Sequence, residues 1–226
     1  MDDTTWTLVE TERRTLADLL DGLTPQQWEA ESLCSEWRIR DVAAHLAMPM
    51  AGVPKPGSLI KALARNRGHL WRAGRDVVIA YAERPTDQII DDLRRQAASR
   101  TKPGFVAADN ILPDLLVHGQ DIAVPLGLDR PIPPAAGEVG LRRTWAMGWP
   151  FYARRRLAGL GLRADDCDWS AGSGPEVSGS AGALLLLMSR RTDAALELLH
   201  GPGVEVLTQR TGVRVTTSGR RSDGGE

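Results

Sequence analysis

Three residues able to bind a metal ion or a proton, Asp114, His118 and Asp121, lie within the apolar stretch LPDLLVHGQDI at residues 112–122. They are spaced by four and three residues in a chain that holds only 4 histidines. On a helix, residues four apart stand one turn above each other, so Asp114 and His118 point the same way. Two side chains at this spacing can chelate one metal ion. Asp121, one turn further on, is placed to orient a liganding imidazole.

A third ligand must come from another helix, because two ligands do not make a tight site. His45 is the best candidate, since it lies in the middle of the helical stretch RIRDVAAHLAMPM among alanines and a leucine. We therefore predict a divalent metal site with His45, Asp114 and His118 as ligands and Asp121 behind them. Spacing alone leaves two other interpretations open: Asp114 and His118 as a solvated helix pair, and His45 as a hydrogen-bonded core residue.

Amphipathic helices must position these residues. Apolar side chains recur at three- and four-residue steps over 4–22, which predicts a first helix. Thr24 is the expected cap of a short second turn, with Pro25 as its first helical residue. Helical patterns return at 38–50, 59–82, 84–99 and 108–124. The proline- and glycine-rich string at 52–58 must interrupt them. We expect a four-helix bundle over residues 1–130.

The character of the sequence changes after GLDRPIPPAAG at 127–137. Beyond this boundary come a helical pattern, a strand with a glycine-rich turn, and one or two alanine- and leucine-rich helices. VEVLTQ at 204–209 and VRVTTS at 213–218 alternate apolar and polar residues and predict strands. We expect an α+β protein whose second domain, 135–218, is small and mixed, followed by a disordered tail at 219–226.

Composition narrows the classes of function. The chain has 226 residues, and 28 Lys and Arg balance 29 Asp and Glu, which does not favour a nucleic-acid partner. The hydrophobic share of 42% supports a real core. No window approaches the roughly 18 apolar residues of a membrane span. The N-terminus begins with acids and is unlike a secretion signal. We expect a cytoplasmic globular protein without a membrane partner, and leave its oligomeric state open.

The two cysteines, Cys34 and Cys167, are far apart and form no CxxC motif. This argues against a disulfide framework and against a zinc site built from cysteines. We expect two unpaired thiols. Cys34 is not expected to be a nucleophile, because no histidine lies near it in the sequence.

Two stretches carry a family resemblance, CSEWRIRDVAAHLA at 34–47 and DLLVHGQDIAVPLG at 114–127. They resemble the two signature stretches of the mycothiol-dependent maleylpyruvate isomerase family, part of the larger DinB-like metal-binding superfamily. In that family a tryptophan and an arginine lead into a helix with a liganding histidine, and a later helix carries an acid, a histidine and an aspartate. The corresponding residues here are Trp37, Arg40, His45, Asp114, His118 and Asp121.

The resemblance extends to CDWSAGSGPEVSGSAGALLLLMSRR at 167–191, which is similar to the family's C-terminal domain and in style to sterol carrier proteins. It implies a DinB-like bundle followed by a domain that helps to close a cleft and can supply cations for acidic substrate groups. Arg190 and Arg191 are candidates for that role, with ordinary surface arginines as the alternative. The family's acidic ligand is glutamate. Asp114 is shorter by one methylene, so it must approach an ion more closely or bind through water.

Two histidines and one carboxylate leave open positions on an ion, as in catalytic sites. The resemblance implies that mycothiol enters there as a thiol cosubstrate, with zinc as the expected metal and nickel as an alternative. A metal-bound thiolate can add to an electrophile, which predicts isomerisation or S-transfer. Two other functions stay open: a metal- or small-molecule-binding bundle without catalysis, and a metal-assisted hydrolase that activates water.

Overall fold

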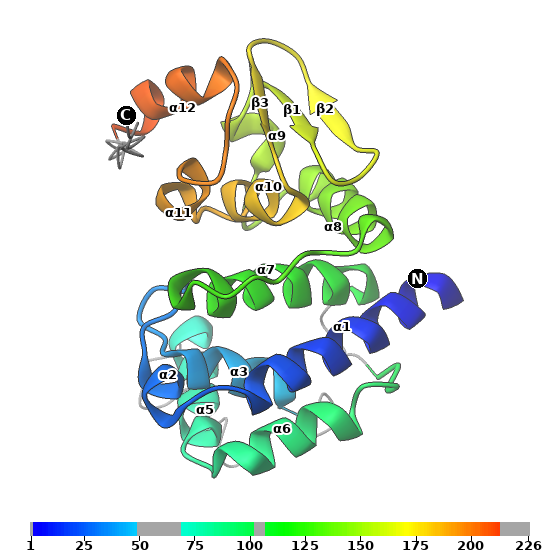
Figure 1. The fold of residues 1–226 in the computed structure, drawn as a ribbon, viewed down its shortest axis with the longest axis vertical. Coiled ribbons are helices and arrows are strands. Elements are labelled where there is room, and N and C mark those ends of the chain that lie inside the picture. The colour runs from blue at the N-terminus through cyan, green and yellow to red at the C-terminus, as the bar shows by residue number, and fades with distance from the viewer. Residues whose placement is uncertain (1, 49–68, 102–106, 213–226) are drawn as a thin grey trace, which may run out of the picture.

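The computed structural model describes residues 2–48, 69–101 and 107–212. The chain folds into a helical N-terminal region and a mixed C-terminal region with a small sheet (Figure 1). The predicted α+β class is therefore confirmed. The predicted domain bounds stay predictions. The expected tail at 219–226, the strand at 213–218 and the early part of the helix at 59–82 lie outside the described residues.

The first helices begin where their capping residues predict. α1 (Asp3–Asp21) starts after Asp2, whose side chain accepts a hydrogen bond from the Thr5 amide at 2.8 Å. α2 (Pro25–Glu29) has the predicted Thr24 cap, and Thr24 and Gln27 exchange side-chain and backbone hydrogen bonds. These caps satisfy amides that have no partner within the helix.

Helices of the N-terminal region pack around an apolar core. They are α3 (Ile39–Ala47), α5 (Leu70–Ala82), α6 (Thr86–Arg95) and α7 (Ile111–Ala123), together with α1. α1 and α3 both pack against α6 and α7, and α3 also packs against α5. Short 3-10 turns, Ala108–Asn110 and Val124–Leu126, extend α7 at its two ends. This packing brings α3 and α7, the two elements that carry the predicted ligands, side by side.

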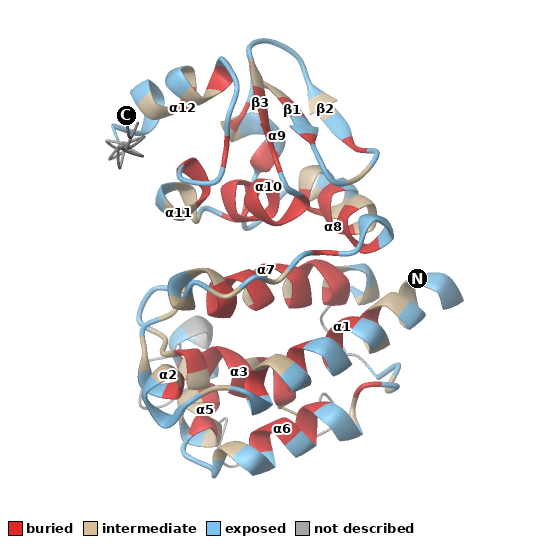
Figure 2. Cartoon of the chain, viewed as in Figure 1, coloured by how far each residue is buried: buried red, intermediate tan, exposed pale blue. Residues whose placement is uncertain are grey.

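α7 is the central helix of the molecule. It packs on α1 and α3 on one side, and on α8 (Pro134–Ala146) and α10 (Ala181–Met188) on the other. Figure 2 shows α7 and α10 as largely buried. A Cβ placed on Gly140 of α8 would lie 2.6 Å from Leu116 Cδ1, so glycine allows α8 to approach α7 closely. α7 therefore has little free surface left, and part of it carries Asp114 and His118.

The C-terminal region contains a three-stranded sheet of order β2-β1-β3. β1 (Gly161–Ala164) pairs antiparallel with β2 (Ser170–Gly172) and parallel with β3 (Glu176–Gly179). The remaining helices are α9 (Ala153–Arg156), α11 (Thr192–Leu196) and α12 (Gly203–Thr211). Every residue of α10 is buried, since this helix lies against α7, α8, α11 and the sheet.

The predicted strand at 204–209 is wrong, because these residues form α12. The short run VEVL fits an alternating pattern, but Val204 and Leu207 are three residues apart and also share one face of a helix. Leu207 is buried in the helix, and the Thr208 and Thr211 hydroxyls donate to the carbonyls of Val204 and Leu207. A run this short does not separate the two periods.

Candidate metal centre

The loop before α3 holds Trp37 beside the helix that carries His45. The Ser32 amide and hydroxyl donate to the Trp37 carbonyl at 3.1 and 2.8 Å, and the Trp37 amide donates to the Cys34 carbonyl at 3.0 Å. At the start of α3, Asp41 accepts from the Arg38 amide at 2.9 Å. His45 follows in the last turn, and its side chain is half-buried.

Asp114 and His118 of α7 converge with His45. His45 Nε2 lies 3.3 Å from Asp114 Oδ2, and His118 Nε2 lies 3.5 Å from Asp114 Oδ1. One ligand atom from each residue lies within 4.8 Å of one from each of the others. The two imidazole centroids are 5.0 Å apart. The sequence-predicted trio thus comes together from two helices that are 69 residues apart at these positions.

These separations suit a single small cation. Nitrogen and oxygen ligands at about 2.0–2.2 Å from a tetrahedral zinc ion stand roughly 3.3–3.5 Å apart. The shorter aspartate side chain reaches both imidazoles directly. The Asp114 side chain is 45% exposed, that of His45 32% and that of His118 13%. A cation held by these groups would therefore be open to solvent on the Asp114 side.

The two histidines favour the ionised form of Asp114. Burial would raise the pKa of Asp114, but the His118 and His45 imidazoles and Arg191 outweigh it and lower the pKa to about 2. Burial would lower the pKa of His45, but the Asp114 carboxylate raises it above the ordinary histidine value. The carboxylate is therefore ionised at neutral pH, which is the form that binds metal.

Asp121 is hydrogen-bonded to His118. Its Oδ2 lies 2.8 Å from His118 Nδ1, and its two oxygens accept from Arg191 at 2.9 and 2.6 Å. Burial opposes the charge on Asp121, yet His118 and Arg191 lower its pKa. Because an ionised carboxylate only accepts hydrogen bonds, Nδ1 of His118 donates to Asp121, and Nε2 is the ring nitrogen that faces Asp114. The predicted orienting role of Asp121 thus has a geometric basis.

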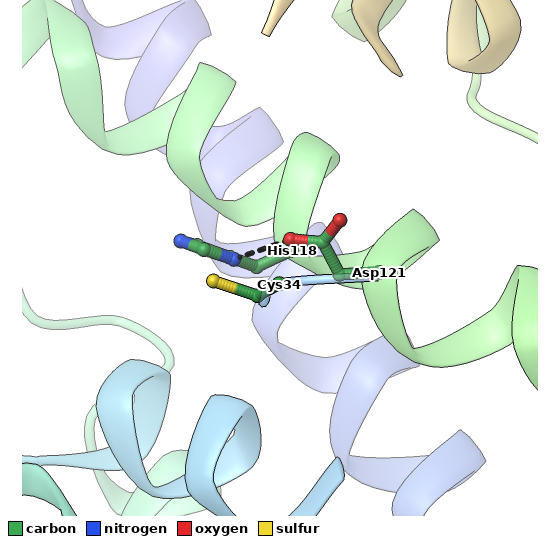
Figure 3. A group of neighbouring side chains, drawn as sticks. All are labelled: Cys34, His118 and Asp121. Atoms are coloured by element: carbon green, nitrogen blue, oxygen red, sulfur yellow. Dashed lines mark hydrogen bonds and ion pairs between the residues drawn. The ribbon is translucent and has the colours of Figure 1, made fainter. Parts of the chain in front are cut away.

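A second trio, Cys34, His118 and Asp121, is also close enough to hold a cation. Figure 3 shows the Cys34 sulfur beside the His118 ring, with Asp121 bonded to that ring. Asp121 is fully buried, and its oxygens already accept from Arg191 and His118, so the trio of His45, Asp114 and His118 is the more accessible ligand set. Burial, with Asp121, raises the pKa of the Cys34 thiol to about 11. Cys34 is therefore a protonated thiol next to the site, and both cysteines are unpaired as predicted.

The arginines singled out by the sequence lie in different surroundings. Arg191 is nearly buried and held by Asp121 and the Ser189 carbonyl, while Arg190 is exposed with a φ of 73°. Their contact with substrate stays a prediction. Arg40 bonds Glu29 and the carbonyls of Ala82 and Arg84, and so it joins α3 to the end of α5.

Nothing in the sequence predicts that Arg191 and Cys34 lie beside the residues of the trio. The Arg191–Asp121 pair spans 70 residues, and no local pattern signals it. Cys34 lies 84 residues before His118, far beyond any helical spacing, but the fold places them together.

The N-terminal region matches a known protein family. Residues 9–102 match the family model described as the mycothiol maleylpyruvate isomerase N-terminal domain. The resemblance to the mycothiol-dependent maleylpyruvate isomerase family is confirmed. The match includes Trp37 and His45, whereas Asp114 and His118 lie beyond it. No curated protein matches the sequence significantly.

One solved structure, a crystal structure of a variant of the mycothiol-dependent maleylpyruvate isomerase, aligns with the chain at a TM-score of 0.45 and 17% identity. The alignment covers 87% of this chain and 91% of that one. Separately, among the described residues no helix is both long and apolar enough to cross a bilayer.

Proposed function

We propose that this protein is a metal-dependent enzyme that activates a low-molecular-weight thiol, mycothiol, for isomerisation or S-transfer on a small electrophile. The observation that carries the proposal is the convergence of His45, Asp114 and His118 on one point, with Asp114 open to solvent. The match of residues 9–102 to the mycothiol maleylpyruvate isomerase N-terminal domain supports the choice of thiol. Zinc is the proposed metal, with nickel as the alternative.

The proposed architecture gives each region a task. A DinB-like four-helix bundle over residues 1–130 supplies the three ligands. A C-terminal domain over 135–218, similar to sterol carrier proteins, supplies Arg191 to the Asp121 carboxylate and closes one side of the site. The tail at 219–226 has no proposed role.

The residues of the chain divide the chemistry as follows. His45 and His118 would each present a neutral nitrogen to the metal, and Asp114 would present one anionic oxygen. Asp121 would accept the hydrogen bond from Nδ1 of His118. A bound divalent cation stabilises a thiolate and so supplies the nucleophile at neutral pH. The exposed side of Asp114 leaves room for the thiol sulfur and the electrophile to approach. Cys34, held as a thiol, does not compete as the nucleophile.

Metal analysis tests the site. Purified wild-type protein should retain about one zinc or nickel ion per chain, and His118→Ala should lose it, because two ligands hold a cation much more weakly than three. His200→Ala is the matched control, since His200 pairs with Asp165 in the C-terminal region and should not alter metal content. Equal metal content in wild type and His118→Ala would show that the proposed metal site is wrong.

Product analysis tests the activity. Wild-type protein, mycothiol and maleylpyruvate are incubated and examined by mass spectrometry and chromatography. An isomerised product or a thioether that requires both mycothiol and metal supports the proposal. Metal binding without turnover would instead identify a binding protein. In a parallel incubation with an ester and no mycothiol, metal-dependent hydrolysis would identify a hydrolase.

A further inference from the structure

The two imidazoles of the proposed site are held in different ways. His118 has an outer partner, Asp121, at 2.8 Å from Nδ1, and Arg191 fixes Asp121 in turn. His45 bonds only to Asp114, itself a proposed ligand, and no other residue in the described parts of the chain bonds to its ring. Since liganding histidines usually need an outer contact to fix the ring, something else must orient His45.

Trp37 lies against both rings. Its indole centroid is 5.4 Å from that of His45 with a tilt of 59°, and 6.4 Å from that of His118 at 19°. Both separations are within the range of favourable aromatic pairs. Trp37 therefore fills the space on one side of the two imidazoles and restricts the rotation of His45.

The backbone of Trp37 is itself fixed. Hydrogen bonds from Ser32 to the Trp37 carbonyl, and from the Trp37 amide to Cys34, close the loop. The Leu33 amide donates to the Asp121 carbonyl at 3.1 Å, which attaches this loop to α7. The loop backbone is thus attached to α7 and continues into α3, so the position of Trp37 is defined relative to His45 and to His118.

We propose that Trp37 is a positioning residue of the metal site, whose indole holds the His45 imidazole so that Nε2 faces Asp114. It does for His45 by ring packing what Asp121 does for His118 by hydrogen bonding. This inference rests on the proposed function, because it takes His45 to be a ligand.

Zinc affinity of purified variants, measured by competition with a chromophoric chelator, is the first test. Trp37→Leu should bind zinc about tenfold more weakly, at the lower end of the loss found when an outer contact of a ligand is removed. Trp37→Phe, which keeps an aromatic face, should bind close to the wild-type affinity. Trp145→Leu is the matched control, since Trp145 is a half-buried tryptophan packed on Trp169 away from the site. Wild-type affinity in Trp37→Leu would overturn the inference.

A spectroscopic measurement separates positioning from general stability. The visible spectrum of the Co²⁺-loaded protein reports ligand geometry, and it should change in Trp37→Leu but not in Trp37→Phe or Trp145→Leu. An unchanged spectrum in Trp37→Leu would show that the indole does not set the geometry.

NMR of the metal-free wild-type protein decides the inference even if Trp37→Leu does not fold. Nuclear Overhauser effects between the Trp37 indole and the His45 ring, with His45 χ1 couplings of a single rotamer, are expected. Their absence would overturn the role of Trp37. A wild-type protein that binds no zinc would instead overturn the proposed function, and the NMR result would still show whether Trp37 holds His45.

Discussion

Arg191 donates two hydrogen bonds, at 2.9 and 2.6 Å, to the carboxylate of Asp121, a residue 70 positions earlier in the chain. The Asp121 side chain is completely buried and that of Arg191 is 14% exposed. The pair joins the segment between α10 and α11 to α7. Since the same carboxylate also bonds His118, the C-terminal region reaches a proposed metal ligand through two consecutive contacts.

Asp121→Asn should weaken metal binding. A neutral amide has one acceptor oxygen in place of two and binds the Nδ1 proton of His118 more weakly, and loss of such an outer partner costs about 10- to 100-fold in metal affinity. Zinc competition assays measure the change. Asp165→Asn, which removes a carboxylate from the exposed pair with His200, is the control. If Asp121→Asn kept wild-type affinity, Asp121 would not orient His118.

Arg191→Met should destabilise the metal-free fold by about 3–5 kcal/mol, because it leaves the buried charge of Asp121 without its partner. Urea denaturation gives the free energy of unfolding. Arg94→Met, which breaks exposed pairs with Asp18 and Asp21, should change the free energy of unfolding much less, because solvent screens these charges. If Arg191→Met and Arg94→Met lowered the free energy of unfolding equally, burial of the Arg191–Asp121 pair would not account for its contribution to stability.

Asp114→Asn should change how the stability of the metal-free protein depends on pH. The pKa of Asp114 is lowered from 3.8 to about 2, so its ionised form stabilises the fold above 3.8 and loses this effect as pH falls towards 2. His45 has a raised pKa, so its charged form stabilises the fold below 6.5 and loses this effect as pH rises through the raised value.

The difference in unfolding free energy between wild type and Asp114→Asn should therefore be largest from about pH 4 to about pH 6.5 and smaller on either side. Urea denaturation at a series of pH values, with a chelator present, measures it. A difference that does not vary with pH would show that Asp114 and His45 do not interact as ions.

Cys167 should react slowly with iodoacetamide in the folded protein. Burial, together with Asp166 and Glu138, raises the pKa of its thiol to about 11, and only the thiolate is nucleophilic. The alkylation rate, followed by mass spectrometry of the Cys167 peptide, should rise about tenfold per pH unit well beyond pH 9. A rate that levels off near the pKa of a free thiol, about 8.5, would contradict this environment.

Helical spacing places Asp114 and His118 on one face of α7 and His45 on a second helix, but spacing alone leaves open whether the three side chains meet. Thr24 and Pro25 at the start of α2 follow in the same way from capping chemistry. Periodicity was insufficient at Val204 to Leu207, where four residues fit a strand and a helix equally. The contacts of Arg191, Cys34 and Trp37 with the site depend on tertiary packing, which no local pattern records.

The position of α7 between two packed layers has a consequence for any shortened form of the protein. A fragment that stops at residue 130 would keep His45, Asp114 and His118, but it would expose the leucines of α7 that lie against α8 and α10 and would lose the guanidinium that neutralises Asp121. Such a fragment is expected to self-associate and to bind a cation weakly, although every proposed ligand atom is still present.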